Sequence, residues 1–320
     1  MECVKSVWAI LKEKWVNSMI RIILNGKKVA DEDVRYAVSV LREEGIDIEV
    51  RVTWEHGDAQ RMVAEASDEG ITRIVAAGGD GTLNEVVNGL ALLPKKKRPQ
   101  LAILPLGTAN DFATACQIPF SPLEALRLAV EGEAYPVDIA KANDRYFINV
   151  ASSGFGAQIV ADTPASLKNF LGGGAYTLSA VIMTLNYSSH EGRLIADDLD
   201  IEGKSIAGVI CNGREAGGGQ MLAPFAYIDD GMLDIVVFME FPITDLGQVI
   251  AEMFDYEHSG TYIKRFQKKW VESIPQQKRS VNLDGEPYEA DRIRFEVLHK
   301  EIDLILPKGC PVLKSSRSGS

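Results

Sequence analysis

The chain has 320 residues, a length that favours two domains and can bury a sizeable core. Its composition is that of an ordinary globular protein, with 46% hydrophobic and 25% charged residues, which excludes collagen, coiled coil and extended disorder. The formal net charge of −11 argues against broad nucleic-acid binding and against capture of the whole surface by anionic membranes. An anionic ligand would therefore have to be attracted by groups close to its binding site.

The four cysteines are far apart and form no CxxC pair, so the sequence indicates neither a zinc site nor a disulfide framework. No apolar run reaches the roughly 18 residues of a membrane span. Residues 1–18 lack the continuous apolar stretch of a signal peptide. We expect a cytoplasmic protein with an N-terminal extension over residues 1–18 and a disordered tail over 314–320. A helix skimming a membrane surface stays open as the alternative for residues 1–18.

Strands alternate with helices from Ile20 onward. Strands are predicted over 20–24, 46–52, 74–77 and 101–104, and helices over 31–44, 58–67 and 82–92. This alternation predicts βαβ units and a mostly parallel sheet over residues 19–134. Such sheets bind ligands at the carboxyl ends of their strands, which selects the segments after Ala77 and after Leu104.

The pattern changes near residue 135, where short strands separated by turn signals begin. Strands are predicted over 137–142, 146–151, 194–200, 205–211, 233–239, 280–283, 293–297 and 302–306, and helices over 167–185 and 244–253. This series suggests an antiparallel sandwich or barrel over residues 135–313. The basic run from Lys95 to Arg98 is interpreted as a solvated loop, with a contact to anionic lipid headgroups as the alternative.

The glycine-rich turn from Gly78 to Thr82 joins a predicted strand to a predicted helix. Glycines let backbone N–H groups approach a ligand, and the helix N-terminus favours a phosphate there. Asp80 would repel phosphate unless Mg²⁺ lay between them, so it indicates a nucleotide–metal complex. Thr82 is expected to cap the helix or contact a phosphate oxygen. A structural turn with Asp80 as a local cap is the alternative, and neither GxxxxGK[ST] nor GxGxxG is present.

A second polar segment, Pro105–Phe112, follows the next buried strand and should emerge at the same sheet edge. Gly107 permits close backbone approach, and Thr108 supplies a hydroxyl. Asn110 and Asp111 supply an amide and a carboxylate for phosphate or substrate, with helix capping as the alternative.

The segments GGDGTLNEVVNGL and PLGTANDFA resemble the catalytic domain of the diacylglycerol kinases and their bacterial lipid-kinase relatives of the YegS type. The resemblance runs over roughly residues 20–313 and includes LDGEP at 283–287. The GGDGT core alone is shared with NAD kinases and some phosphofructokinases, so the combination carries the specificity. It implies a three-layer α/β nucleotide-binding domain, joined to a mainly antiparallel β-sandwich domain, with ATP and Mg²⁺ in the cleft.

The same resemblance implies roles for individual residues. Glu286 would be the general base, and Asp80 would be catalytic. A second, structural Mg²⁺ would be bound by the carbonyls of Tyr227 and Met232 and the carboxylate of Asp230, with a metal-free hairpin turn as the alternative. The ATP-binding residues would be Thr53, Gly79, Asp80, Gly81, Thr82, Leu83, Asn84, Glu85 and Thr108.

Two further glycine-containing segments are interpreted from the residues. Asp284 and Glu286, as alternate residues of a strand, would face one side and meet the metal and the hydroxyl. An Asp284–Gly285 hairpin turn is the alternative. The run from Gly217 to Gly219 is expected to be a flexible loop. Thr114 stands where several relatives have arginine, so one charge contact of the family is absent.

The leading hypothesis is an ATP- and Mg²⁺-dependent kinase that phosphorylates a hydroxyl of a membrane lipid, of the diacylglycerol or phosphatidylglycerol class. Such an enzyme would reach its lipid by transient peripheral contact with the membrane. NAD kinase is the enzyme alternative. A catalytically silent nucleotide- or lipid-binding regulator is the alternative outside enzymes.

Overall fold

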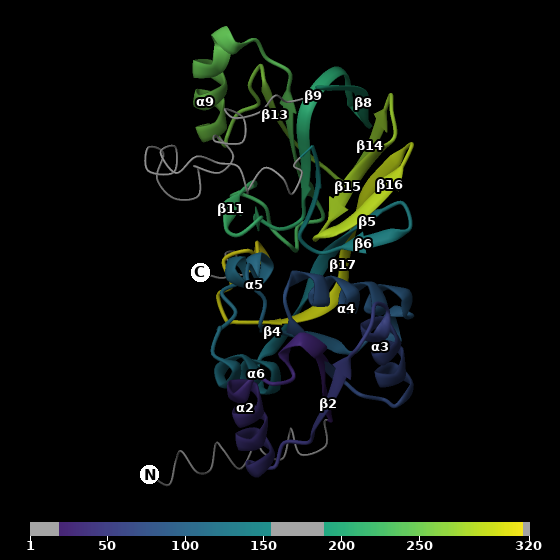
Figure 1. The fold of residues 1–320 in the computed structure, drawn as a ribbon, viewed down its shortest axis with the longest axis vertical. Helices are drawn as coiled ribbons and strands as arrows, with labels where there is room; N and C mark the ends of the chain where they lie inside the picture. The colour runs from purple at the N-terminus through teal and green to yellow at the C-terminus, as the bar shows by residue number, and fades with distance from the viewer. Residues whose placement is uncertain (1–18, 155–188, 316–320) are drawn as a thin grey trace. The chain divides into compact units, whose positions relative to one another are not determined.

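The computed structural model describes residues 19–154 and 189–315 (Figure 1). The chain divides into two compact units: unit 1 contains the residues up to Val137 together with Glu301–Pro311, and unit 2 contains Asp138–Lys300 and the residues from Val312 on. The helix predicted over 167–185, the extension over 1–18 and most of the tail lie outside the described residues. No helix within the described ranges is both long and apolar enough to cross a membrane.

Unit 1 is an α/β structure whose elements follow the predicted alternation. They are β1 (Ile20–Asn25), α2 (Glu32–Glu43), β2 (Ile48–Thr53), α3 (Asp58–Asp68), β3 (Arg73–Gly78), α4 (Asp80–Leu92), β4 (Gln100–Pro105), α5 (Asp111–Ala115) and α6 (Pro122–Glu131), with short 3₁₀ turns at Gly26–Lys28 and Lys95–Lys97. The strands pair in parallel in the order β2–β1–β3–β4. The last strand of the chain, β17 (Ile293–Leu306), adds to β4 in parallel at Leu304.

Helices cover both faces of this sheet, which gives the three layers. On one face, the apolar stripe of α2 and the buried side of α6 pack on alternate strand residues such as Ile22 and Val75. On the other face lie α3 and α4, which pack against each other (Figure 1). The predicted stripe of α2 is confirmed, and Asp31 caps this helix by accepting a hydrogen bond from the Val34 amide over 3.2 Å.

The helix predicted over 82–92 begins two residues earlier than expected. Gly79 is the N-cap residue, and α4 starts at Asp80, so Thr82 lies inside the first turn and does not cap the helix. The reason is steric: the Gly78–Gly79 pair lets the chain turn directly from β3 into the helix.

Unit 2 is mainly antiparallel, which confirms the predicted fold class. Its strands and helices are β5 (Glu133–Ala142), β6 (Arg145–Phe147), β7 (Val150–Ser153), β8 (His190–Ala196), β9 (Leu199–Cys211), β10 (Glu215–Ala216), β11 (Gln220–Met221), β12 (Leu233–Met239), a 3₁₀ turn (Ile243–Asp245), α9 (Leu246–Phe254), β13 (Ile263–Lys268), β14 (Trp270–Pro275), β15 (Arg279–Leu283), β16 (Glu286–Ala290) and most of β17. The long strand β9 pairs with β7, β8 and β12, and β12 pairs in turn with β13.

Two apolar clusters hold this unit together. One includes Phe147, Ile235 and Phe295 and fills the interior between strands of the sandwich. The other places Val249 and Met253 of α9 against residues of β9, β12 and β13. The alternating burial of the strands therefore produces two packed layers of side chains on opposite faces of β9 and β12.

Several predicted segments of unit 2 differ in extent. The strand predicted over 194–200 crosses a two-residue turn between β8 and β9, at Asp197–Asp198, where Ala196 pairs with Leu199. The two strands predicted within 293–306 are one strand, β17. Strands β13, β14 and β16 were not predicted, because charged residues interrupt their apolar pattern.

The basic run of unit 1 is only partly solvated. The Arg98 side chain donates to the Glu301 carboxylate over 2.7 Å and to the carbonyl oxygens of Ala91, Leu93 and Glu301. Arg98 therefore holds the end of α4 to the C-terminal part of β17, and it is not available to a lipid headgroup.

Candidate functional site

Two glycine turns of unit 1 touch at the carboxyl ends of β3 and β4. A Cβ atom added to Gly107 would lie 2.5 Å from the Cα atom of Gly79, a distance that real Cβ contacts essentially never show. The Leu106 amide also donates to the Gly78 carbonyl over 2.8 Å. The two turns predicted from separate motifs therefore form one backbone surface, and this approach requires glycine.

Asn110 closes the second turn. Its backbone has a left-handed φ of 51°, and its side chain accepts from the Gly107 amide over 2.8 Å and donates to the Gly107 carbonyl over 2.9 Å. Asn110 occupies the N-cap position of α5, but its side chain makes no capping bond. Its amide group therefore shapes the turn at Gly107, and the predicted capping interaction is wrong.

Asp80 connects the first turn to the second. Its carboxylate accepts long hydrogen bonds, each 3.4 Å, from the backbone amides of Asp111 and Phe112 at the start of α5. It thus caps a neighbouring helix, whereas the alternative considered from the sequence was a cap within its own turn. Burial raises the pKa of Asp80 above its ordinary value, and the negative charge of Asp111 raises this pKa further.

This pair of carboxylates fits a divalent cation. Asp80 and Asp111 supply hard oxygen atoms, and a cation beside them would relieve the repulsion that raises the pKa of Asp80. The described residues contain no group of three or more His, Cys, Asp or Glu side chains that could hold a metal by themselves. Asp80 and Asp111 are therefore the carboxylates of this edge that could contribute oxygen ligands to a divalent cation.

The predicted ATP-binding residues differ in how much of each faces solvent. Gly79, Asp80, Gly81, Glu85 and Thr53 are half-buried, and Thr108 is exposed. Thr82, Leu83 and Asn84 are buried. The available surface at this sheet edge is consequently made of the turn backbone together with Asp80, Thr53 and Thr108.

Thr82 and Thr53 are tied to the end of β1. The Thr82 hydroxyl accepts a hydrogen bond from Asn25 over 2.9 Å, and the Thr53 hydroxyl accepts from the Gly26 amide over 3.4 Å. A hydroxyl that accepts can still donate its proton to a phosphate oxygen. Asn25 also pairs with Thr53 in the strand register, so three strand ends meet here.

Sequence reasoning missed two residues of this edge. Asn25 directly follows a buried strand, which is the same signal that selected Gly78 and Pro105. His56 lies 3.1 Å from the Glu85 carboxylate through its Nδ1 atom. No local motif marks that pair, because β2 and α4 bring it together.

In unit 2, Asp284 and Gly285 form a tight hairpin turn between β15 and β16. Both residues have positive φ, 49° and 101°, and Leu283 pairs with Glu286 across the turn. Asp284 and Glu286 therefore do not share one strand face, and the hairpin alternative is confirmed. Glu286 is exposed, as the first residue of β16.

The Asp284 carboxylate has a structural role. It accepts hydrogen bonds from the backbone amides of Ile148, Asn149 and Val150 over 2.7, 3.1 and 2.8 Å. These bonds fix the hairpin to the segment between β6 and β7. They thereby hold Asp284, two positions before Glu286, in place.

The predicted second metal site is a turn that precedes β12. The Asp230 side chain is 6% exposed, accepts from the Met232 amide over 3.1 Å and lies 3.6 Å from the Lys314 ammonium. Burial raises the pKa of Asp230. The turn is not a hairpin, because the strands before and after it, β11 and β12, do not pair with each other. Its Gly231 amide donates over 2.7 Å to the fully buried Asp138. A buried carboxylate is an oxygen donor of the kind that a cation prefers, and Lys314 already supplies one positive charge to it.

The run from Gly217 to Gly219 is the turn of the short hairpin formed by β10 and β11. All three glycines have left-handed φ values, between 68° and 87°. The turn thus requires glycine for its conformation, which explains why three glycines follow one another. The sequence had predicted a flexible loop here.

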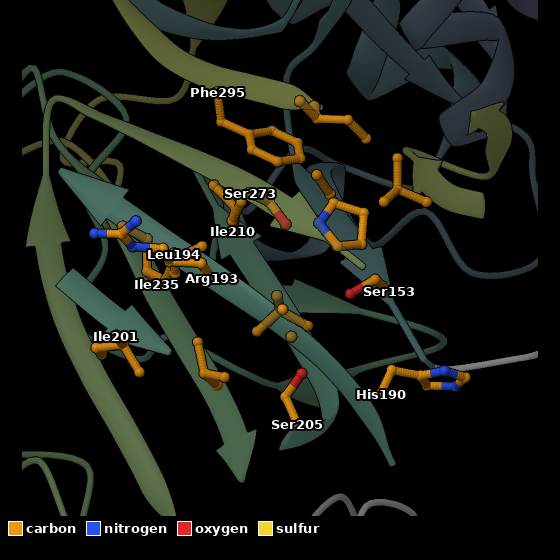
Figure 2. Close-up of a pocket in the computed structure, with 18 of the residues that line it drawn as sticks. Ser153, His190, Arg193, Leu194, Ile201, Ser205, Ile210, Ile235, Ser273 and Phe295 are labelled. Carbon is orange, nitrogen blue, oxygen red and sulfur yellow. The ribbon is translucent and has the colours of Figure 1, made fainter. Parts of the chain in front are cut away.

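Unit 2 also contains a largely apolar cavity between strands of the sandwich. Its volume is about 870 Å³ including its solvent-open mouth. Figure 2 shows Ile210, Ile235 and Phe295 directed toward this space, with Arg193 and His190 at its periphery. Gly208 also lines the cavity, and a side chain built there would meet only ordinary van der Waals contacts.

Comparisons with known proteins agree with this architecture. The profile of the diacylglycerol kinase catalytic domain matches residues 19–142, and that of the YegS C-terminal NAD kinase beta sandwich-like domain matches residues 149–306. A Shewanella frigidimarina protein named probable lipid kinase YegS-like is 47% identical, over 94% of this chain and 98% of its own length. Its Chromohalobacter salexigens counterpart of the same name is 44% identical, over 91% and 94%.

A solved Bacillus anthracis structure, of a protein assigned to the diacylglycerol kinases, superposes with a TM-score of 0.75. It is 27% identical to this chain, and the match covers 91% of this chain and 97% of that one. These matches to two family profiles, to relatives of similar length and to a shared fold agree with the structure. They are consistent with the glycine turns of unit 1 and with the sandwich of unit 2. The chain belongs to the YegS-like lipid kinases, which carry the diacylglycerol kinase catalytic domain, and it is a kinase.

Proposed function

We propose that this protein transfers the γ-phosphate of ATP, in the presence of Mg²⁺, to a hydroxyl of a membrane lipid of the diacylglycerol or phosphatidylglycerol class. The observation that carries the proposal is the contact between the Gly79 and Gly107 turns, with Asp80 and Asp111 beside it. We assign nucleotide binding to residues 19–134 and lipid binding to residues 135–313. Contact with the membrane is transient and peripheral.

The phosphates bind where backbone is exposed and side chains are absent. Gly79 and Gly81 are half-buried at the N-terminus of α4, where the first amides and the helix dipole favour negative charge. Thr108 and Thr53 supply hydroxyl groups at the same strand ends. Thr82 is buried in the first turn of α4 and supports the glycine turn there. Asn110 acts indirectly, because its side chain fixes the conformation of Gly107.

Asp80 and Asp111 are the residues that would hold Mg²⁺. A bound Mg²⁺ would neutralise charge on the phosphates, and such electrostatic stabilisation is a main source of catalysis in phosphoryl transfer. Asp80 also positions α5 through its two long bonds to backbone amides. Loss of Asp80 would therefore weaken both cation binding and the contact between the two turns.

Glu286 acts as the general base. Its carboxylate takes the proton of the lipid hydroxyl as the oxygen attacks the γ-phosphorus, and the bond from that phosphorus to the bridging oxygen of ADP breaks. The exposed position of Glu286 at a rigid turn supports this role, since Asp284 fixes the turn by three backbone hydrogen bonds. A base on a tight hairpin keeps a defined position while remaining accessible to a lipid.

The apolar cavity of unit 2 would accept the acyl chain of the lipid (Figure 2). Buried aliphatic and aromatic side chains such as Ile210, Ile235 and Phe295 line it, whereas serines and Arg193 supply polar groups. Apolar pockets with a few polar groups are typical of sites for amphiphilic ligands. Asp230, with the carbonyls of Tyr227 and Met232, would hold a second, structural Mg²⁺.

Labelled γ-phosphate transfer from ATP to a total lipid extract, followed by identification of the product, tests the proposal. Asp80→Ala and Glu286→Ala should each reduce transfer by about 100-fold or more. Glu289→Gln on the same strand β16 is the matched control and should transfer at the normal rate. Full transfer by both variants, or transfer to NAD in place of lipid, would overturn the proposal.

A further inference from the structure

Arg265 on β13 carries a positive charge that forms no ion pair with the carboxylates of the described residues. Its Nε and Nη1 atoms are buried and have no hydrogen-bond partner among those residues. Its Nη2 atom makes one long bond, 3.4 Å, to the Met253 carbonyl, and the guanidinium lies 5.6 Å from the centre of the Tyr256 ring. Buried donors of this kind are rare in folded proteins, because each loses its bonds to water without replacement.

The carboxylates near Arg265 are bound to other donors. Glu252 accepts from the backbone amides of Thr261, Tyr262 and Ile263. Asp255 is paired with His258, and Asp234 accepts from Gln267 over 3.0 Å. Burial lowers the pKa of Arg265, and Asp255 and Glu252 attract its charge without forming an ion pair with it, so the buried N–H groups remain without an acceptor among the described residues.

Arg265 lines a small pocket whose remaining walls suit an amphiphile. The pocket lies among β9, β11, β12, β13 and the end of α9. Of the described residues that line it, Arg265 alone is charged, and Gln220 and Tyr256 are the other polar ones; Glu252 and Asp255, which attract Arg265, are not among these lining residues. Met221 and Phe254, 36% and 51% exposed, form its apolar rim.

A neighbouring hollow, which Arg265 also lines, has the opposite character. Asp234 and Glu257 both line it, so an anion there would meet two carboxylates. The smaller pocket has none among its described lining residues. An anionic group would therefore reach the guanidinium through the smaller pocket, past Met221 and Phe254.

We propose that Arg265 anchors a phosphate-binding site, in which the guanidinium binds the phosphate of an anionic phospholipid or free phosphate. Guanidinium groups match phosphate oxygens through parallel N–H donors. Met221 and Phe254 would contact the apolar part of a lipid beside its headgroup. This site lies apart from the residues assigned to phosphate transfer, and it holds a phosphate group without cleaving it.

The first arm of the test measures binding to phosphatidylcholine vesicles with and without phosphatidylglycerol. Arg265→Met should weaken binding to the anionic vesicles about tenfold or more, as expected for a lost charge-assisted contact. Arg292→Met is the matched control, because it removes the same charge from an exposed arginine paired with Glu272. Equal binding by the two variants would overturn the proposal for a lipid headgroup.

The second arm uses inorganic phosphate, compared with chloride at equal ionic strength, and follows thermal unfolding. Phosphate should raise the Tm of the Arg292→Met variant more than that of Arg265→Met. This result without vesicle binding assigns the site to free phosphate, and vesicle binding that depends on Arg265 assigns it to the lipid headgroup. No dependence on Arg265 in either arm overturns the proposal.

Folding of the variants is itself informative. Because the buried N–H groups lack partners among the described residues, Arg265→Met should unfold no more readily than the normal protein in phosphate-free buffer. A large loss of Tm there would indicate a structural arginine and would contradict the proposal. Phe254→Ser provides a second variant: it should weaken vesicle binding while leaving stabilisation by inorganic phosphate unchanged.

Discussion

Gly107 and Gly79 lie so close that a Cβ atom on Gly107 would stand 2.5 Å from the Cα atom of Gly79 and 2.7 Å from the side-chain oxygen of Asn110. The contact joins the turn after β4 to the turn after β3. Both turns are backbone surfaces at one sheet edge, so neither can move outward without breaking the other's packing. The two motifs therefore act as one structural feature.

Gly107→Ala should disturb this feature directly. We expect a loss of about 1–3 kcal/mol in the free energy of unfolding, because the added methyl group has no space. ATP–Mg²⁺ should also raise the Tm of the variant less than that of the normal protein. Gly247→Ala is the control, since a Cβ there meets nothing within 4 Å. An unchanged ATP-dependent shift in Gly107→Ala would contradict the assigned role.

Glu286 and Asp284 should separate activity from stability. Glu286→Gln should lower the transfer rate by about 100-fold or more, with unchanged unfolding, because the residue is exposed and acts as a base. Asp284→Asn should lower the free energy of unfolding by about 1–3 kcal/mol, because three backbone amides lose a charged acceptor. Denaturant unfolding and kinase assays distinguish the two. Asp291→Asn, at an exposed position, provides the reference for a simple loss of charge.

Lys314 should compete with Mg²⁺ for Asp230. The ammonium lies 3.6 Å from the carboxylate, so Lys314→Met should increase the Tm shift caused by Mg²⁺. Asp230→Asn should reduce that shift. Thermal unfolding with Mg²⁺ and with a chelator checks both, without use of activity. Identical Mg²⁺ responses in the two variants would argue against a cation at this turn.

Gly208→Leu should fill part of the apolar cavity without a clash at the backbone, because a Cβ atom placed there would lie 3.6 Å from the nearest atom, the Ser153 Oγ. The KM for long-chain lipids should rise about tenfold, which corresponds to about 1.4 kcal/mol. The KM for short-chain analogues and for ATP should change little, since neither needs the full cavity. An equal rise for long and short chains would show that the cavity does not hold the acyl chain.

Asp58 should make the loop before α3 sensitive to acid. Its carboxylate accepts from the amides of Trp54 and Glu55 and pairs with Arg61, and these contacts lower its pKa from 3.8 to about 2. A carboxylate whose pKa is lowered in the folded state stabilises the protein at pH values above its ordinary pKa of 3.8. This stabilisation is lost as the pH falls toward 2. The Tm difference between the normal protein and Asp58→Asn should be constant near neutral pH and shrink on acidification. A difference that grew on acidification would contradict this assignment.

The α/β half could be predicted from the sequence, because the local periodicity of apolar residues there coincides with the helices and strands. The stripe of α2 and the short apolar strands are local signals, and the glycine turns after β3 and β4 follow from the rule that parallel strands end at one edge. The family could likewise be inferred from GGDGT, PLGTANDFA and LDGE.

The roles of the polar side chains could not be predicted from the sequence, because they depend on contacts between distant segments. Asp80 binds the start of α5, Asp284 binds the backbone beside β7, and Arg98 binds the end of β17, and in each case the partner is at least 31 positions away in sequence. Arg265 offers the clearest example. Nothing in its local sequence marks it, and its proposed function as an anion site depends on the packing of β9, β11, β12 and α9 around a charge that no carboxylate of the described residues pairs with.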